Sequence, residues 1–288
     1  PDTETLKARA AACEKAALAI KGVVNSSGAG ASYGEGRRWF ATSDGFFGVS
    51  GGARHSVSVS VLSKDAKGME RDYDYDSKTH YSDMRTPDAI GVRAGECAVR
   101  RLSPRKLKSR TALVIYDKRV SASLLGHLAG AVNGAAIARG VSYLKDKKGA
   151  KIFAAGVNVV DDPHIRRGHG SRPFDGEGGA VQPATLVEDG VITMWMLNAA
   201  AARQLGVEPN GHASSGHGGP PVSSEIQCPL LVVTDAHTTS PGQNENSIVR
   251  NNLNTTEAET IGVDIYDRAR EIYYRAKRSG RRRSAGII

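Results

Sequence analysis

Hydrophobic and polar positions alternate in the first third of the chain. The valines of residues 55–62 lie at every second position, which predicts a strand with one buried face. Residues 70–76 also alternate. They are interpreted either as a strand with Tyr73 and Tyr75 on one face or as a solvated sheet edge. Residues 23–36 are small and polar, and they favour a loop or a weak strand.

Helical spacing of apolar residues predicts three longer helices. Asp2 is a suitable cap for a helix that continues to about Ile20. A Thr-Pro pair favours the start of a second helix over residues 86–102. Residues 121–139 are predicted to form a helix of small residues, in which each glycine costs about 1 kcal/mol relative to alanine. We expect these glycines to allow the close approach of another backbone: Gly126, Gly130 and Gly134.

The second half of the chain mixes short strands with glycine-rich loops. Buried strands are predicted at residues 112–116 and 157–160, and a hairpin at 185–197 with its turn at Glu-Asp-Gly. An asparagine caps a short helix over residues 198–206, and a long glycine-rich loop follows at 211–221. These patterns predict an α/β (α+β) fold, with mixed sheets, flanking helices and a glycine-rich C-terminal β portion.

Composition narrows the class of protein. The 288 residues suffice for one large or two ordinary domains, and the formal net charge is +9. Cys13, Cys97 and Cys228 are far apart, which argues against a disulfide framework or structural zinc and favours a cytoplasmic location. No apolar run is long enough to span a membrane. The chain starts with Pro1 rather than methionine, so we expect it to begin partway into a longer protein.

The last segment, residues 222–288, differs in character from the rest. It is rich in Asn, Thr and Ser, is helical in pattern over residues 256–278, and ends in clustered arginines. The arginines favour either a solvated tail or a nucleic-acid contact, and no aromatic residues alternate with them to support single-strand binding. We divide the chain into residues 1–110, 111–221 and this tail, which we expect to be the most irregular part.

Several polar clusters have both a structural and a chemical interpretation. Asp161, Asp162 and His164 could contribute to a metal site, but Asp-Asp-Pro is also ordinary turn chemistry. His164 and His169 flank two arginines, which favours either an anionic partner or a solvated loop. The serines beside histidines in the 211–221 loop are not part of a Gly-x-Ser-x-Gly nucleophile elbow, the motif that would indicate a serine hydrolase.

The sequence Ser-Arg-Pro-Phe-Asp-Gly-Glu-Gly at residues 171–178 contains the strongest functional candidates. Its Arg172, Asp175 and Glu177 lie among glycines, which allow close approach to another chain. They are interpreted as groove or interface residues, or alternatively as an arginine–carboxylate ion pair that only stabilises the fold.

Three blocks of the sequence resemble the TldE/PmbA half of the TldD/TldE peptidase family. They lie at residues 68–76, 123–149 and 160–178, and the hairpin at 184–192 follows them. The resemblance covers about residues 2–221, whereas the tail does not match. Family members also carry an N-terminal domain that has no counterpart here. The resemblance implies a barrel-like C-terminal β portion.

In TldD subunits the helix that matches residues 121–139 carries a His-Glu-x-x-x-His motif, and a cysteine adds a further zinc ligand. Two imidazoles would bind zinc and the glutamate would activate its water. The matching positions here are Gly126, His127 and Ala131, and Cys228 lies in the unmatched tail. The resemblance therefore implies no catalytic or metal residue in this chain. The expected groove or interface residues are Gly126, His127, Gly130, Arg172, Asp175 and Glu177.

The implied function is that of a non-catalytic subunit of a cytoplasmic metallopeptidase complex acting on unfolded peptides. It would need no cofactor of its own, because zinc is expected on a TldD-like partner, and the isolated chain could form a homodimer. No membrane contact is expected, and nucleic-acid binding is disfavoured despite the family's older name, modulator of DNA gyrase. One alternative is a stand-alone metallopeptidase using His127, Asp162, His164 or His169. Another is a nucleic-acid-binding adaptor acting through the basic tail.

Overall fold

The computed structural model describes residues 1–104, 118–214 and 219–223, together with short strand segments at 114–115, 226–227, 231–233, 247–249 and 286–287. The chain divides into two compact units. The first comprises residues 1–40 and 49–109, and the second comprises residues 41–48 and 110–288. Each unit has its own buried apolar cluster.

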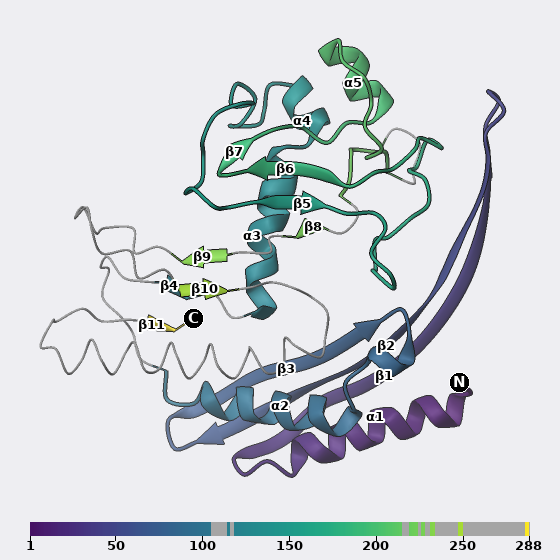
Figure 1. Cartoon of the computed structure of the whole chain (residues 1–288). Coiled ribbons are helices and arrows are strands. Elements are labelled where there is room, and N and C mark those ends of the chain that lie inside the picture. The colour runs from purple at the N-terminus through teal and green to yellow at the C-terminus, as the bar shows by residue number, and fades with distance from the viewer. Residues whose placement is uncertain are drawn as a thin grey trace, which may run out of the picture. The chain divides into compact units, whose positions relative to one another are not determined.

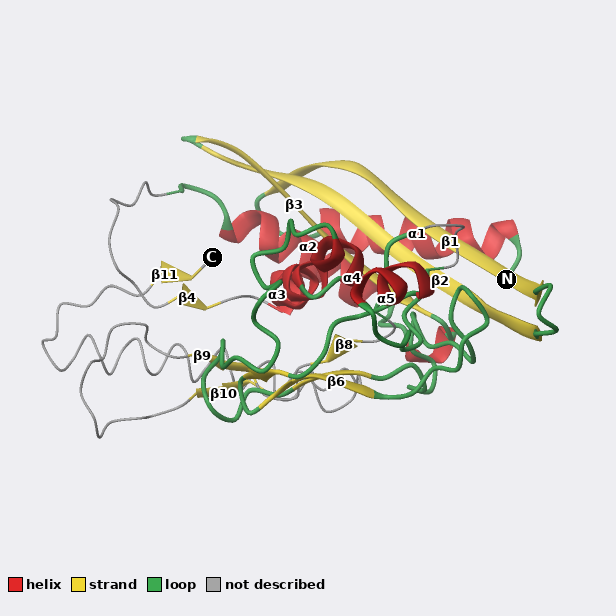
Figure 2. Ribbon diagram, turned by 90° about the horizontal axis from the view of Figure 1, so that it is seen from above, coloured by secondary structure: helices red, strands yellow, loops and turns green. Residues whose placement is uncertain are grey.

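The first unit is a three-stranded sheet with two helices along one face (Figures 1 and 2). The strands are β1 (Val23–Ala41), β2 (Phe47–Asp65) and β3 (Gly68–Lys78), in the order β1-β2-β3. The helices are α1 (Thr3–Leu18) and α2 (Pro87–Arg100), and a 3-10 turn at Tyr81–Asp83 follows β3. The core joins the alternating valines of β2 to apolar residues of both helices: Val57, Val59, Val61, Cys13, Ala17, Ile90, Ala94 and Ala98.

The alternating segments form strands, as predicted. The three β2 valines are at most 2% exposed. Residues 23–36 belong to the 19-residue strand β1, so the strand interpretation holds and the loop interpretation is wrong. Tyr73 and Tyr75 share the outer face of β3, whereas Asp74 faces inward and pairs with Arg85 at 2.7 Å. An inward carboxylate is tolerated here because the guanidinium satisfies it.

Local capping explains where the first two helices begin. The Asp2 carboxylate accepts a hydrogen bond from the Thr5 amide at 2.8 Å, and the Thr86 hydroxyl accepts one from the Ala89 amide at 3.3 Å. The two helices then pack closely at Gly91, where an added Cβ would lie 2.1 Å from the Cys13 carbonyl oxygen. Only glycine permits this approach.

The second unit contains a four-stranded antiparallel sheet in the order β7-β6-β5-β8. The strands are β5 (Val159–Asp161), β6 (Ala184–Glu188), β7 (Val191–Ile192) and β8 (Ile226–Gln227). Helix α3 (Lys118–Ala131) crosses this sheet in Figure 1. Buried side chains of α3, of the sheet and of residues next to them form one core: Leu128, Val132, Val159, Leu186, Val187, Ile192 and Met196.

Two short helices and two small strand pairs complete the described part of this unit. The helices are α4 (Gly134–Ala138) and α5 (Ala199–Leu205). In the strand pairs, β4 (Val114–Ile115) pairs in parallel with β11 (Gly286–Ile287), and β9 (Leu231–Val233) pairs antiparallel with β10 (Ser247–Val249). The α+β class is therefore confirmed, but these described strands do not show the barrel-like arrangement. Most of the tail, including the predicted helix at 256–278, lies outside the described residues.

The predicted single helix over residues 121–139 is wrong in one respect, because the chain breaks between α3 and α4. Asn133 leaves the helix and caps α4, accepting a hydrogen bond from the Ala135 amide at 3.1 Å. The Gly134 amide donates to the Met196 carbonyl oxygen at 2.8 Å instead of continuing α3. A distant segment thus supplies a competing hydrogen-bond partner.

The predicted hairpin and the helix after it are confirmed. Asp189 and Gly190 have φ values of 47° and 82°, as a two-residue turn between antiparallel strands requires. Asn198 caps α5 through the Ala201 amide at 2.9 Å, and Gly206 ends the helix with a φ of 67°. Within the described ranges, no helix has the length and apolarity that crossing a membrane requires.

Candidate functional site

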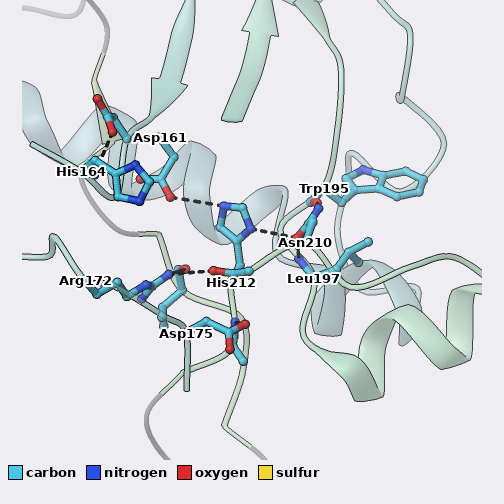
Figure 3. A network of polar contacts seen from close by, with 12 residues as sticks. Asp161, His164, Arg172, Asp175, Trp195, Leu197, Asn210 and His212 are labelled. Carbon is cyan, nitrogen blue, oxygen red and sulfur yellow. Dashed lines mark hydrogen bonds and ion pairs between the residues drawn. The ribbon is translucent and has the colours of Figure 1, made fainter. Parts of the chain in front are cut away.

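A buried polar network lies where β5 ends and the loop after α5 passes it (Figure 3). His212 and Asp161 are 2% and 1% exposed, and His212 Nε2 lies 3.3 Å from Asp161 Oδ2. His212 Nδ1 lies 2.8 Å from Asn210 Oδ1. Both ring nitrogens of the histidine therefore have partners inside the protein.

Main-chain groups determine how Asn210 is oriented. Its Nδ2 donates to the Trp195 carbonyl oxygen at 2.8 Å, and its Oδ1 accepts from the Leu197 amide at 2.8 Å. The oxygen must therefore face His212, so Nδ1 of the ring carries a hydrogen and donates it.

Arg172 joins the same loop to the segment that follows residue 219. Its guanidinium donates to the carbonyl oxygens of Gly211 at 3.3 Å and Val222 at 3.1 Å. The Val222 amide in turn donates to the His212 carbonyl oxygen at 2.8 Å. Burial lowers the pKa of Arg172 from its ordinary value, while the charges of Asp161 and Asp175 act in the opposite direction.

Asp175 holds its own loop against residue 213. One carboxylate oxygen accepts from the amides of Glu177 at 3.0 Å and Gly179 at 2.7 Å. The other accepts from the Ala213 amide at 3.0 Å. The side chain is 3% exposed, so its acceptor sites are used within the chain.

Three more polar side chains bind main-chain groups around this loop. Glu177 accepts from the Ala199 amide at the start of α5 at 2.9 Å. Asn198 donates to the Gly219 carbonyl oxygen at 3.0 Å, and Asn133 donates to the Pro221 carbonyl oxygen at 2.6 Å. The network therefore organises residues 210–213 and 219–222.

This arrangement positions loops rather than presenting a reactive group. His212 has no ring nitrogen available to take a proton from a substrate, because Asp161 and Asn210 engage both. Ser214 is half-buried, while Ser215 and His217 lie outside the described residues. Where the chain is described, no group of three or more His, Cys, Asp or Glu side chains is placed to hold a metal ion.

The predicted site residues fall into two groups. Arg172, Asp175 and Glu177 are held in the network above, through contacts to main-chain atoms. Gly126, His127 and Gly130 are exposed on α3, and the structure does not bring them together with the first group. Their interface role stays a prediction.

The close backbone approach expected at the helix glycines occurs at a different position. A Cβ added at Gly134 would lie 2.5 Å from Leu197 Cδ2 and 2.6 Å from the Met196 carbonyl oxygen. At Gly126 and Gly130, an added Cβ would meet no described atom within 4 Å. Within the described chain, only the third glycine is therefore explained by packing.

The structure favours the turn interpretation at Asp162, whose Oδ1 accepts from the His164 amide at 2.8 Å. His164 and His169 are exposed, so their role toward an anionic partner stays a prediction.

Sequence reasoning missed Asn210, which orients His212. Its signal is weak because a loop asparagine beside glycine is also typical of an ordinary turn.

Two family models match consecutive parts of the chain. The PmbA/TldA metallopeptidase central domain matches residues 1–102, and the C-terminal domain of the same family matches residues 109–231. Among curated proteins, metalloprotease PmbA of Escherichia coli O157:H7 is 36% identical over 72% of this chain and 46% of its own length. A PmbA homologue of Haemophilus influenzae is 30% identical over 71% of this chain and 46% of its own length.

Solved structures support the same fold. A proposed modulator of DNA gyrase from Bacteroides thetaiotaomicron is 25% identical, with a TM-score of 0.69 over 79% of this chain and 50% of that protein. TldE from Thermococcus kodakarensis is 17% identical, with a TM-score of 0.68 over 79% of this chain and 52% of that protein. The fold and the two matched domains are those of a metallopeptidase-like protein. The chain belongs to the TldD/TldE (PmbA) family, and it spans about half the length of the curated relatives it matches.

A zinc ion does not fit the described residues at the α3 positions that match the His-Glu-x-x-x-His motif of TldD subunits. Zinc needs imidazole, thiolate or carboxylate ligands. The corresponding positions of α3 offer Gly126, an exposed His127, and Ala131, which is 7% exposed. No catalytic step through zinc is therefore assigned to this chain.

Proposed function

We propose that the chain acts as the non-catalytic, TldE/PmbA-like subunit of a TldD/TldE metallopeptidase complex that cleaves unfolded peptides. A TldD-like partner would hold the zinc ion. The observation that carries this proposal is the composition of α3, which has glycine and alanine at the two positions where imidazole ligands would be needed. A single histidine without neighbouring ligands binds zinc too weakly to retain it.

The exposed stripe of α3 is our proposed contact with that partner. Gly126 and Gly130 are four residues apart, so they lie on one face of the helix, and His127 is beside them. Side chains at these glycines would project into space that no described atom occupies. A partner backbone could approach closely there. Arg172, Asp175 and Glu177 would support this contact indirectly, by holding the loops that follow β5 and α5.

The test is reconstitution with metal analysis. The chain, a TldD-like subunit and their mixture are purified separately, then assayed for zinc content and for cleavage of an unfolded peptide. We expect zinc on the TldD-like subunit, none in stoichiometric amount on this chain, and full cleavage only in the mixture. Near one zinc per isolated chain, lost in His127→Ala, would instead support the stand-alone metallopeptidase.

The interface is tested by substitutions that add bulk to exposed helical positions. Gly130→Leu should weaken capture of the TldD-like subunit by roughly tenfold or more, because a leucine there separates the two backbones. Ala200→Leu, on the exposed surface of α5, is the matched control and should leave capture unchanged. Equal capture by the two variants would remove α3 from the interface.

A further inference from the structure

The segment after α4 presents two large apolar side chains to solvent. Its alternate residues are anchored inside the second unit: the Ser142 hydroxyl donates to the Ala131 carbonyl oxygen at the end of α3 at 2.6 Å, and Leu144 belongs to the apolar core. Val141 and Tyr143 alternate with these anchors and are 69% and 77% exposed. No other large apolar side chain of the described residues is as exposed.

Positive charge surrounds these two side chains in the sequence. Residues 139–151 contain one arginine, four lysines and a single aspartate, which gives this stretch a formal net charge of +4. We call it the basic loop. Lys145 lies 4.0 Å from Asp146, and Lys151 lies 3.4 Å from Asp189 in the turn between β6 and β7. With Asp189 counted, the net charge is still +3.

The basic loop is held against the sheet at its far end. The Gly149 amide donates to the Ile192 carbonyl oxygen of β7 at 2.7 Å. Lys148 Nζ lies 5.5 Å from the centre of the Trp195 ring, a distance typical of a cation–π contact. A surface that is already ordered loses little conformational entropy when a partner binds to it.

The chemistry of the basic loop favours an acidic polypeptide over other anionic partners. Nucleic acid is bound by neutralising many phosphates, and the carboxylates of Asp146 and Asp189 oppose a dense row of phosphates. Stable binding to an anionic lipid surface needs more apolar area than Val141 and Tyr143 provide. Protein interfaces combine an aromatic anchor with a charged, solvated rim, which is the combination present here.

We propose that the basic loop binds an acidic segment of another protein, in which an apolar side chain packs against Val141 and Tyr143 while flanking carboxylates pair with Lys145 and Lys147. Tyr143 supplies the apolar contact area, and the lysines supply orientation and a faster association rate. The proposal does not depend on the proposed subunit role, because it requires neither zinc nor a TldD-like subunit.

The probe is a fluorescent peptide of about twelve residues, with aspartate and glutamate on both sides of a central leucine and phenylalanine. Its binding to the purified chain is measured by fluorescence polarisation. A second peptide has serine in place of the leucine and phenylalanine, and a third has asparagine and glutamine in place of the acids. We expect both control peptides to bind roughly tenfold more weakly or worse than the probe.

Charge-reversal variants make the test specific to the basic loop. Lys145→Glu combined with Lys147→Glu should weaken probe binding by roughly tenfold or more. Lys21→Glu combined with Lys67→Glu, two exposed positions of the first unit, changes the net charge of the chain equally and should leave the affinity within about twofold of the parent value. All four side chains are exposed, so equal urea midpoints of the two double variants show that both remain folded.

Tyr143→Ser tests the apolar contact separately from the charges. It should weaken binding of the probe by roughly fivefold or more and leave the affinity of the peptide that lacks leucine and phenylalanine unchanged. The tyrosine is 77% exposed, so the substitution removes little packing within the chain. An equal effect on both peptides would mean that Tyr143 does not contact the apolar side chain.

Other results would overturn the proposal as a whole. No binding of the probe to the parent chain excludes it, and equal losses in the two charge-reversal variants reduce it to long-range attraction. A single-stranded oligonucleotide or anionic vesicles that bind more tightly than the probe, with the same dependence on Lys145 and Lys147, assign the loop to nucleic acid or lipid. Loss of capture of a TldD-like subunit in the loop variant, with probe binding intact, assigns the loop to that subunit.

The chain itself contains a competing acidic sequence. Residues 256–267 include four acidic residues and no lysine or arginine. A variant with these four acids changed to their amides should bind the probe as the parent chain does. A gain of roughly tenfold or more in this variant would mean that the chain's own sequence competes for the loop, and the assignment to another protein would be wrong.

Discussion

Replacing Asp175 with asparagine should destabilise the second unit strongly. The carboxylate accepts three main-chain hydrogen bonds, two on Oδ1 from Glu177 and Gly179 and one on Oδ2 from Ala213. Asparagine has almost the same shape, but only one of its two terminal atoms can accept. If its oxygen takes the Oδ1 position, its NH₂ group faces the amide of Ala213, donor against donor.

The size of this effect follows from the burial of the site. A hydrogen bond to a charged acceptor contributes about 1.5–3 kcal/mol, and a buried donor without a partner costs a further 1–3 kcal/mol or so. Asp175 is 3% exposed, so water cannot readily replace the lost partner. Because the loops can relax in part, we expect the free energy of unfolding to fall by about 2–4 kcal/mol.

The assay is urea unfolding followed by tryptophan fluorescence. The chain has two tryptophans, Trp39 and Trp195, so Trp39→Phe leaves a single reporter in the second unit. Asp162→Asn is the matched control, because this side chain is half-buried and, among the described residues, it accepts one hydrogen bond, on Oδ1 from the His164 amide. Asparagine forms the same turn, so the control should change stability by less than about 0.5 kcal/mol.

The comparison of the two variants decides the question. Asp175→Asn and Asp162→Asn remove the same charge thirteen positions apart in sequence. Free energies of unfolding that agree within about 0.5 kcal/mol would refute the reasoning. That result would mean that the three main-chain bonds to Asp175 contribute little and that the loop is held by other contacts.

Three further outcomes are expected. Gly134→Ala should lower the free energy of unfolding by about 1–3 kcal/mol, because its Cβ would lie 2.5 Å from Leu197 Cδ2 and 2.6 Å from the Met196 carbonyl oxygen. Gly126→Ala should raise the free energy of unfolding by up to about 1 kcal/mol, because no described atom lies within 4 Å of the added Cβ. A higher urea midpoint for Gly134→Ala than for Gly126→Ala would contradict the packing argument. Burial raises the pKa of the Cys13 thiol from its ordinary value of 9.0 to about 11, so the unfolded chain loses this proton first and stability falls between pH 9 and 11. The free energy of unfolding should fall by about 1–2 kcal/mol over this range, after allowance for solvent screening. This fall should be absent in Cys13→Ala. The same dependence of unfolding free energy on pH in the parent chain and the variant would exclude the effect of the Cys13 thiol.

Local interactions made several elements predictable from the sequence. The Thr-Pro pair at residues 86–87 places the start of α2, because capping involves atoms only three residues apart. The Asp-Gly pair at residues 189–190 determines a two-residue turn in the same way. Alternating valines in β2 predicted which face is buried, since side chains alternate along any strand.

Elements whose state depends on distant partners were predicted less well. The polar, glycine-rich residues 23–36 form part of a long strand because β2 lies beside them, although their own propensity is weak. The helix predicted across residues 121–139 breaks because the Gly134 amide bonds to Met196. Neither partner can be identified from nearby sequence.

The sequence by itself determined the family resemblance, the caps and turns, the alternating core strand, and the absence of zinc ligands at the matching positions of α3. Only the tertiary structure decided that Asp175 binds three amides, that Asn210 orients His212, and that Gly134 rather than Gly126 packs closely. The physical reason is the separation along the chain between the atoms that determine each feature. Caps, turns and alternation depend on atoms a few residues apart, whereas a buried carboxylate or a closely packed glycine such as Gly134 is defined by atoms that other chain segments bring to it.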